Sequence, residues 1–262
     1  MTDFGVLDDA VAICKGVMKT IAPHVEIIDL THEVTPYSIA DGARLLVRTS
    51  QYYPAGTVFV TVIDPGVGTS RKSIVLKTLK GQFFVLPDNG LVSAVAARDG
   101  VAGIREIRNP AWQLAGSSSS TFHGRDVYSP VGAHLARGED WTQVGPVVAR
   151  YTKLDVPLAT TDVTGIHGLV VALDGPYGNL VTNIGREEFE KLAFHPGDLV
   201  HVTVGANELS VPFVRTFGDV APGDALLFID SRNQLSLAVN QGNFAARYQV
   251  VPPATFAVLR RP

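Results

Sequence analysis

Three side chains that can handle a water molecule lie on predicted loops of the N-terminal half: Asp64, Arg71 and His123. The apolar run "TVFVTVI" stops at Asp64, crosses Pro-Gly-Val-Gly and reaches Arg71 seven residues later, and His123 follows in "TFHGRD". Each also has an ordinary explanation, since Asp-Pro-Gly is common turn chemistry and a lone arginine or histidine is often structural. Together, a carboxylate, a guanidinium and an imidazole can hold and polarise a water. Their types do not decide which one takes the proton.

Acidic and aromatic residues near the start form a second candidate set. Asp3, Asp8 and Asp9 lie within "TDFGVLDD", and Tyr37 follows the next predicted strand. Several carboxylates on one loop can bind a hard cation, cap a helix, or accept hydrogen bonds from ribose hydroxyls or an amino group. The histidines show no paired metal-ligand spacing, so we expect no metal ion. The stretch "DPGVGTS" lacks the Gly-Lys-Ser/Thr element of a phosphate-binding loop.

Two further motifs occur after residue 165. The first, "LDGPYGNLVTNIGR", holds Asp174, Tyr177 and Asn179 around glycines that a hairpin turn explains by itself. A ring followed by an amide also suits the face and edge of adenine. The second, "DSRNQ", holds Ser231 and Arg232, which suit either a surface turn or the binding of a carboxylate.

The elements that carry these residues predict two domains. Before residue 150, helical periods at 8–21, 38–53, 91–100 and 124–138 alternate with apolar strands at 25–30, 57–63 and 82–87. That alternation predicts an α/β, Rossmann-like domain with a mostly parallel sheet and flanking helices, whose ligands collect beyond the carboxyl ends of its strands. Later, short β-type runs follow one another and predict an all-β, barrel-like domain. We place the domains at 1–149 and 165–262, with a linker at 150–164.

Composition narrows the possible partners and compartment. The 262 residues carry 22 basic and 25 acidic side chains, a net charge of -3, and show no basic stripe, so we expect neither nucleic-acid nor membrane binding. No apolar run approaches the length of a membrane span, and no secretion signal is evident. Cys14 is the single cysteine, which excludes a disulfide within one chain and favours a reducing cytoplasm.

Seven stretches together resemble a known family. They are "TDFGVLDDAVAICKGVM", "LTHEVTPYSIADGARLL", "YYPAGTVFVTVIDPGVGTSRKSI", "PDNGLVS", "TFHGRDVYSPVGAHLA", "DGPYGNLVTNI" and "DSRNQLSLAVNQGN". Taken in order through nearly the whole chain, they are similar to the S-adenosyl-L-methionine hydroxide adenosyltransferases, relatives of the fluorinases and chlorinases. The resemblance implies attack of water or hydroxide on ribose C5′ of S-adenosylmethionine, giving adenosine and L-methionine without a cofactor. It also implies a homotrimer whose sites lie between one subunit's N-terminal domain and its neighbour's C-terminal domain.

The resemblance also implies roles for individual residues. The family's catalytic aspartate, arginine and histidine fall on Asp64, Arg71 and His123. The implied substrate contacts are Asp3 on the ribose hydroxyls, Asp8 on the methionine amino group, Tyr37 and Phe122 on the nucleoside, Tyr177 and Asn179 on adenine, Asp174 on ribose or in shaping the turn, and Ser231 with Arg232 on the methionine carboxylate.

Three alternatives remain. A halide-dependent, chlorinase-like transferase is disfavoured because the Asp64 carboxylate would repel a halide in a dry site. A nucleoside hydrolase would need a metal at Asp3, Asp8 and Asp9, and the match to that family's opening is interrupted by Phe4 and Gly5. A non-catalytic sensor of S-adenosylmethionine or adenosine would not need the three catalytic candidates.

Overall fold

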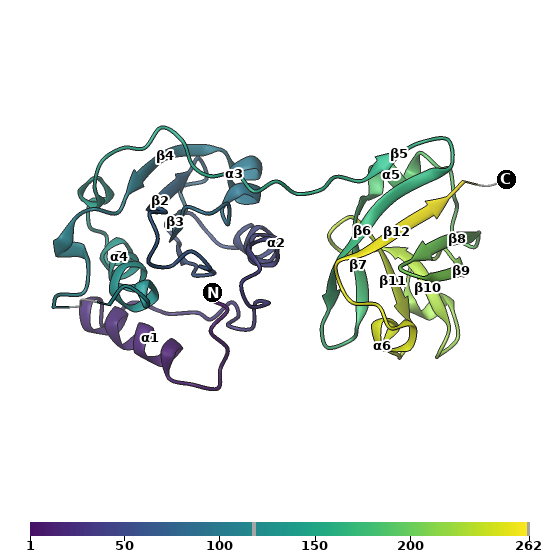
Figure 1. Cartoon of the computed structure of the whole chain (residues 1–262), viewed down its shortest axis with the longest axis horizontal. Helices are drawn as coiled ribbons and strands as arrows, with labels where there is room; N and C mark the ends of the chain where they lie inside the picture. Colours follow the sequence, from purple (N-terminus) through teal and green to yellow (C-terminus); the bar gives the residue numbers. More distant parts are fainter. Residues whose placement is uncertain (117–118, 261–262) are drawn as a thin grey trace. The chain divides into compact units, whose positions relative to one another are not determined.

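The computed structural model describes residues 1–116 and 119–260. The chain divides into two compact units, Met1–Asp155 and Val156–Pro262 (Figure 1). The predicted linker is shared between these units, and its Thr160–Thr161 forms a short strand, β5, that pairs with β6 (Gly165–Asp174). In the part of the chain that the structure describes, no helix is long and apolar enough to cross a membrane.

The N-terminal unit is an α/β unit, as predicted. Its elements are α1 (Ala10–Ile21), α2 (Ile39–Ser50), β1 (Val58–Val60), β2 (Ser73–Thr78), β3 (Phe83–Pro87), α3 (Ser93–Asp99), β4 (Val101–Glu106), the 3-10 helix η1 (Pro110–Trp112), the π-helical turn η2 (Gly124–Tyr128), α4 (Ser129–Ala136) and the 3-10 helix η3 (Trp141–Val144). The sheet has the strand order β1-β3-β2-β4.

This sheet corrects the prediction of a mostly parallel sheet. β1 pairs with β3 in parallel, but β2 is antiparallel to both β3 and β4. The reason is the short connection between β2 and β3, because a turn of this length can only reverse the chain, whereas a parallel pair needs a longer crossover. The predicted strand at 25–30 is wrong, because these residues form neither a strand nor a helix.

Both faces of the sheet are buried, as expected for strands that are apolar throughout. Ile74 and Leu76 of β2 pack in one core cluster with buried residues of α2 and α3. Val75, between them in sequence, packs in a second cluster with Val131 and Leu135 of α4. A Cβ at Gly132 would clash with Val60, so this glycine lets α4 lie directly on β1.

The C-terminal unit is an antiparallel, nearly closed barrel, in agreement with the all-β prediction. Its elements after β6 are β7 (Asn179–Gly185), α5 (Arg186–Glu190), β8 (Leu199–Val204), β9 (Asn207–Pro212), the 3-10 helix η4 (Phe217–Asp219), β10 (Ala225–Ile229), β11 (Gln234–Val239), α6 (Phe244–Tyr248) and β12 (Ala254–Leu259). The order is β10-β11-β7-β6-β12-β8-β9, and a bridge from Phe213 to Leu227 brings the two edges together. β12 and the short helices were not predicted.

Candidate active site

Two successive turns return the chain from Asp64 to Arg71. The amide of Val67 donates to the carbonyl of Asp64 at 3.1 Å, and that of Thr69 donates to Gly66 at 3.2 Å. Gly68 has a φ of 79°, a left-handed conformation that favours glycine. Arg71 therefore comes back beside Asp64, which follows the carboxyl end of β1.

Arg71 and Asp64 form a bidentate, nearly buried ion pair. Arg71 Nε donates to Asp64 Oδ1 at 2.8 Å, and Nη2 donates to Oδ2. The side chains are only 11% and 5% exposed, so solvent screens the pair little. Fork-to-fork pairing of this kind fixes both the position and the orientation of the carboxylate.

Every N–H of the Arg71 guanidinium has an acceptor. Nη2 also donates to His123 Nδ1 at 2.8 Å, while Nη1 donates to Ser73 Oγ at 2.9 Å and faces the carbonyl of Lys72 at 3.5 Å. Because a guanidinium has only donors, His123 Nδ1 must accept, which leaves the proton of the neutral ring on Nε2. Burial, together with the nearby Arg71 charge, lowers the pKa of His123 and favours this neutral form.

Two residues of this cluster were missed from the sequence. Ser73 Oγ lies 3.0 Å from the hydroxyl of Tyr128, which lies 3.5 Å from Asp64 Oδ2. Ser73 opens β2 two residues after Arg71, and Tyr128 ends the π-helical turn that follows His123. The place of Ser73 beside Arg71 was a usable signal. No such signal was available for Tyr128, because helical periodicity in a sequence is recognised at 3.6 residues per turn and a π-helical turn departs from it.

The cluster borders a cavity of about 390 Å³. Asp64 and His123 line it together with three more of the predicted residues, Asp3, Tyr37 and Phe122. Asp3 Oδ2 accepts a hydrogen bond from the amide of Tyr37 at 2.9 Å, which helps to hold Tyr37 at its unusual φ of 66°. The structure therefore brings these five predicted residues to one cavity, with Arg71 behind its wall.

Asp8 lies outside this arrangement. It is exposed and accepts from the amide of Ala10 at 3.1 Å, at the start of α1. Over residues 1–116 and 119–260, no group of three or more His, Cys, Asp and Glu side chains could hold a metal ion, and Asp3, Asp8 and Asp9 accordingly form no such group.

The predicted residues of the C-terminal unit gather at two neighbouring turns. Arg232 Nη2 donates to Asp174 Oδ1 at 2.5 Å, and Asp174 pairs in register with the buried Asn179. Tyr177 and Ser231 are exposed. Nη1 of Arg232 lies in an ion pair with Asp230 Oδ2 at 3.1 Å, and its Nε is buried without an acceptor among the described residues.

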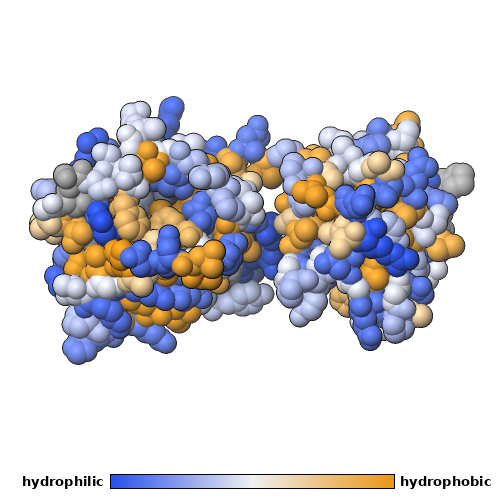
Figure 2. Space-filling view, turned by 60° about the horizontal axis from the view of Figure 1, so that its bottom comes forward, coloured by the Kyte–Doolittle hydropathy of each residue, from blue (hydrophilic) through white to orange (hydrophobic). Residues whose placement is uncertain are grey.

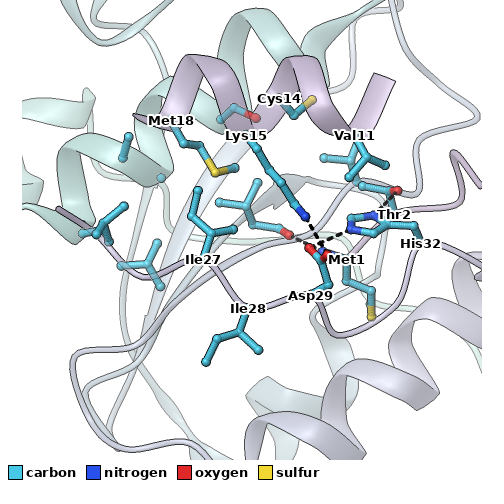
Figure 3. A pocket seen from close by; sticks show the side chains of 18 of the residues that line it. Met1, Thr2, Val11, Cys14, Lys15, Met18, Ile27, Ile28, Asp29 and His32 are labelled. Carbon is cyan, nitrogen blue, oxygen red and sulfur yellow. Dashed lines mark hydrogen bonds and ion pairs between the residues drawn. The ribbon is translucent and has the colours of Figure 1, made fainter. Parts of the chain in front are cut away.

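A second cavity, of about 130 Å³, lies between α1, α4 and the segment before residue 33 (Figure 3). Its polar side holds a chain of contacts in which Asp29 accepts from Lys15 at 2.6 Å and meets His32 Nε2 at 3.1 Å, while His32 Nδ1 meets Thr2 Oγ1 at 2.9 Å. Phe4 lines both cavities and packs edge-on against Phe122. These contacts support the loop that carries Asp3.

A nearly buried ion pair joined to an imidazole at the wall of a cavity is an arrangement typical of enzyme active sites. Comparison with known proteins identifies the family. Residues 1–145 match the SAM hydroxide adenosyltransferase N-terminal domain, and residues 168–256 match its C-terminal domain. The chain belongs to the SAM hydroxide adenosyltransferase family of enzymes.

Individual relatives cover nearly the whole chain. An (R)-S-adenosyl-L-methionine hydrolase of Salinispora tropica is 39% identical, covering 96% of this chain and 93% of the relative. A fluorinase of Actinoplanes sp. is 31% identical, covering 99% and 96%. A crystal structure of an uncharacterized conserved protein from Thermotoga maritima is 40% identical and superposes with a TM-score of 0.93, covering 99% and 98%.

Proposed function

We propose that this protein hydrolyses S-adenosyl-L-methionine to adenosine and L-methionine. The observation that carries the proposal is the nearly buried ion pair of Asp64 and Arg71, hydrogen-bonded to His123 at a cavity, in a chain of the hydroxide adenosyltransferase family. Relatives at 34–39% identity are named (R)-S-adenosyl-L-methionine hydrolase, so we expect the substrate to be the epimer with the R configuration at sulfur.

The reaction requires positioning more than acid catalysis. The oxygen of a water attacks C5′ of the ribose, the bond from C5′ to sulfur breaks, and its electron pair stays on sulfur. Methionine leaves as a neutral thioether, so the leaving group needs no proton. The attacking water loses a proton, and the protein must orient that water and accept or relay this proton.

Asp64 is the proposed proton acceptor. His123 Nδ1 is occupied by a donor from Arg71, and its Nε2 carries the ring proton, so the histidine can donate to the water but not accept from it in this tautomer. Arg71 has no N–H left for the water and acts by orienting both partners. If His123 donates to the water through Nε2, the amide N–H of glutamine can donate from a similar position. We therefore expect His123→Gln to retain more turnover than His123→Ala.

The remaining substrate contacts follow the family resemblance. Asp3, Tyr37 and Phe122 at the cavity would hold the nucleoside, and Asp8 the methionine amino group. Tyr177 and Asn179 would hold adenine, Asp174 the ribose or its turn, and Ser231 with Arg232 the methionine carboxylate. Nε of Arg232, which is buried without an acceptor among the described residues, supports that last role, because it can donate to a ligand carboxylate.

Because these residues are divided between two units, we propose a homotrimer with sites formed by the N-terminal unit of one subunit and the C-terminal unit of its neighbour. Exposed apolar side chains support an interface: Val6, Leu7 and Tyr37 are 69%, 101% and 75% exposed. Figure 2 shows hydrophobic residues at the surface of each unit.

We also propose that the N-terminal unit is Rossmann-like in one respect, which is the position of its site at loops that follow strand ends. A single cysteine supports a cytoplasmic location.

The test is incubation of the protein with each sulfonium epimer in ¹⁸O-water, with chelator and with added chloride, followed by mass spectrometry. Adenosine carrying ¹⁸O at O5′, formed equally with chelator, is the expected result. Chlorinated adenosine would instead favour the halide-dependent transferase, and adenine release that stops with chelator would favour a nucleoside hydrolase. Intact substrate would favour the sensor.

A further inference from the structure

Tyr128 is a fully buried side chain beside the catalytic cluster. The Arg71 guanidinium lies 5.7 Å from the centre of its ring. Burial, together with the nearby Asp64 charge, raises the pKa of Tyr128, so the hydroxyl keeps its proton at neutral pH. Neither Tyr128 nor Ser73 lines the cavity of about 390 Å³. Any effect that these residues have on the reaction must therefore pass through the residues they contact.

The hydroxyl protons can be assigned by counting donors and acceptors. Arg71 Nη1 donates to Ser73 Oγ at 2.9 Å, so the serine proton is available for its other neighbour, the Tyr128 oxygen at 3.0 Å. The Tyr128 proton then points to Asp64 Oδ2 at 3.5 Å, and Asp64 is in turn held by Arg71. In this direction each proton has an acceptor, and the four residues form a closed ring.

We propose that Tyr128 and Ser73 are positioning residues that lock the rotation of Arg71 and Asp64 through this ring. The proposal rests on the proposed hydrolysis for its kinetic consequence. The bidentate pair alone fixes Arg71 relative to Asp64, but both could swing together. The contacts from Ser73 and Tyr128 tie the pair to β2 and to the π-helical turn η2, and so hold Asp64 in place at the cavity wall.

Kinetics of Tyr128→Phe, Ser73→Ala and the double variant test the ring. Tyr128→Phe keeps the aromatic ring against Arg71 and removes only the hydroxyl. We expect kcat to fall about tenfold in each single variant, the size of one hydrogen bond to a charged group, with KM within about twofold. The kcat of the double variant should be about equal to that of the less active single variant, since either change opens the same ring.

Tyr53→Phe is the matched control. Tyr53 lies in the same unit, packs edge-on against Phe59 and does not line the cavity of about 390 Å³, so loss of its hydroxyl should leave kcat unchanged. Single variants with kcat within about twofold of the wild type, or effects that multiply in the double variant, would overturn the proposal. So would a loss that appears only in KM.

A second measurement does not depend on the reaction. In protein labelled with ¹⁵N-arginine, the Nε–H signal of Arg71 can be assigned by its disappearance in Arg71→Lys. We expect its exchange with solvent to rise at least about tenfold in Tyr128→Phe and Ser73→Ala but not in Tyr53→Phe. Unchanged exchange would refute the ring even in an active enzyme. Faster exchange in these two variants of a protein that shows no turnover would retain the ring and reject the proposed hydrolysis.

Discussion

Arg71→Lys separates the charge of Arg71 from its geometry. Lysine keeps a positive charge near Asp64, but its compact ammonium has three donors and no planar fork. It cannot pair bidentately with Asp64 while also donating to His123 Nδ1 and Ser73 Oγ, as Arg71 does at 2.8 and 2.9 Å. If charge alone matters, the variant stays active, and if geometry matters, it does not.

The size of the effect follows from the hydrogen bonds that lysine cannot make. Two hydrogen bonds to or from charged groups disappear, each worth about 1.5 kcal/mol at the low end. Their sum of about 3 kcal/mol corresponds to a loss of about 100-fold in kcat, at about 1.4 kcal/mol per tenfold. No reduction for solvent screening is needed, because the paired side chains are 11% and 5% exposed.

The assay is adenosine release from S-adenosylmethionine, with kcat and KM measured beside urea unfolding. Arg44→Lys is the control: Arg44 donates through Nε and Nη2 to a single oxygen, Oδ1 of Asp41 on α2, with side chains 21% and 16% exposed. This variant therefore loses a partly buried guanidinium–carboxylate contact at residues that do not line the cavity. A folded Arg71→Lys with kcat within about threefold of the wild type would refute the reasoning. An equal loss in Arg44→Lys would refute it as well.

Four further outcomes are expected. Asp64→Asn, which keeps the shape but removes the charge, should lower kcat at least about 100-fold while calorimetry gives an adenosine Kd within about threefold of the wild type. Because the folded pKa of His123 is lowered, the unfolded state binds more protons below pH of about 6.5, so urea midpoints should fall with pH there and fall less in His123→Asn. Because the folded pKa of Tyr128 is raised, its stability contribution holds below pH of about 10 and is lost above it, so Tyr128→Phe should lose less stability in alkaline urea titrations. Arg232→Lys should raise KM about tenfold with kcat nearly unchanged, and a fall in kcat alone would exclude it from substrate binding.

The sequence predicted the helices of the N-terminal unit because their periods and end signals are local. α1 and α2 occupy the predicted ranges, and Gly100 ends α3 with a φ of 68°. The strand directions were predicted less well. The apolar composition of β3 indicated a buried strand, but burial does not set strand direction. No strand range was predicted for β2, so the hairpin of β2 and β3 could not be predicted.

The side chains of the site also show that contacts between residues close in sequence can be predicted, whereas contacts between distant residues cannot. Asp64 and Arg71 could be paired from the sequence because a loop with Gly66 and Gly68 joins them over seven residues. His123 was grouped with them from its residue type and its predicted loop, and the family resemblance implied the same role, but its contact with Arg71, 52 positions away, comes from the fold. Tyr128 carries no sequence signal, because its role depends on a π-helical turn and on burial in a core that only the folded chain defines.

The two arginines of the proposed reaction differ in their spare donors, and this difference separates their roles. Arg71 has every N–H engaged within the protein, so it can orient Asp64 and His123 without reorganising when substrate enters. Arg232 is anchored to Asp174 by Nη2 and lies in an ion pair with Asp230 through Nη1, but its Nε is buried without an acceptor among the described residues. An unsatisfied buried donor is costly, so a ligand carboxylate that satisfies it gains affinity. A fully paired arginine therefore suits the chemical step, and a partly paired one suits substrate binding.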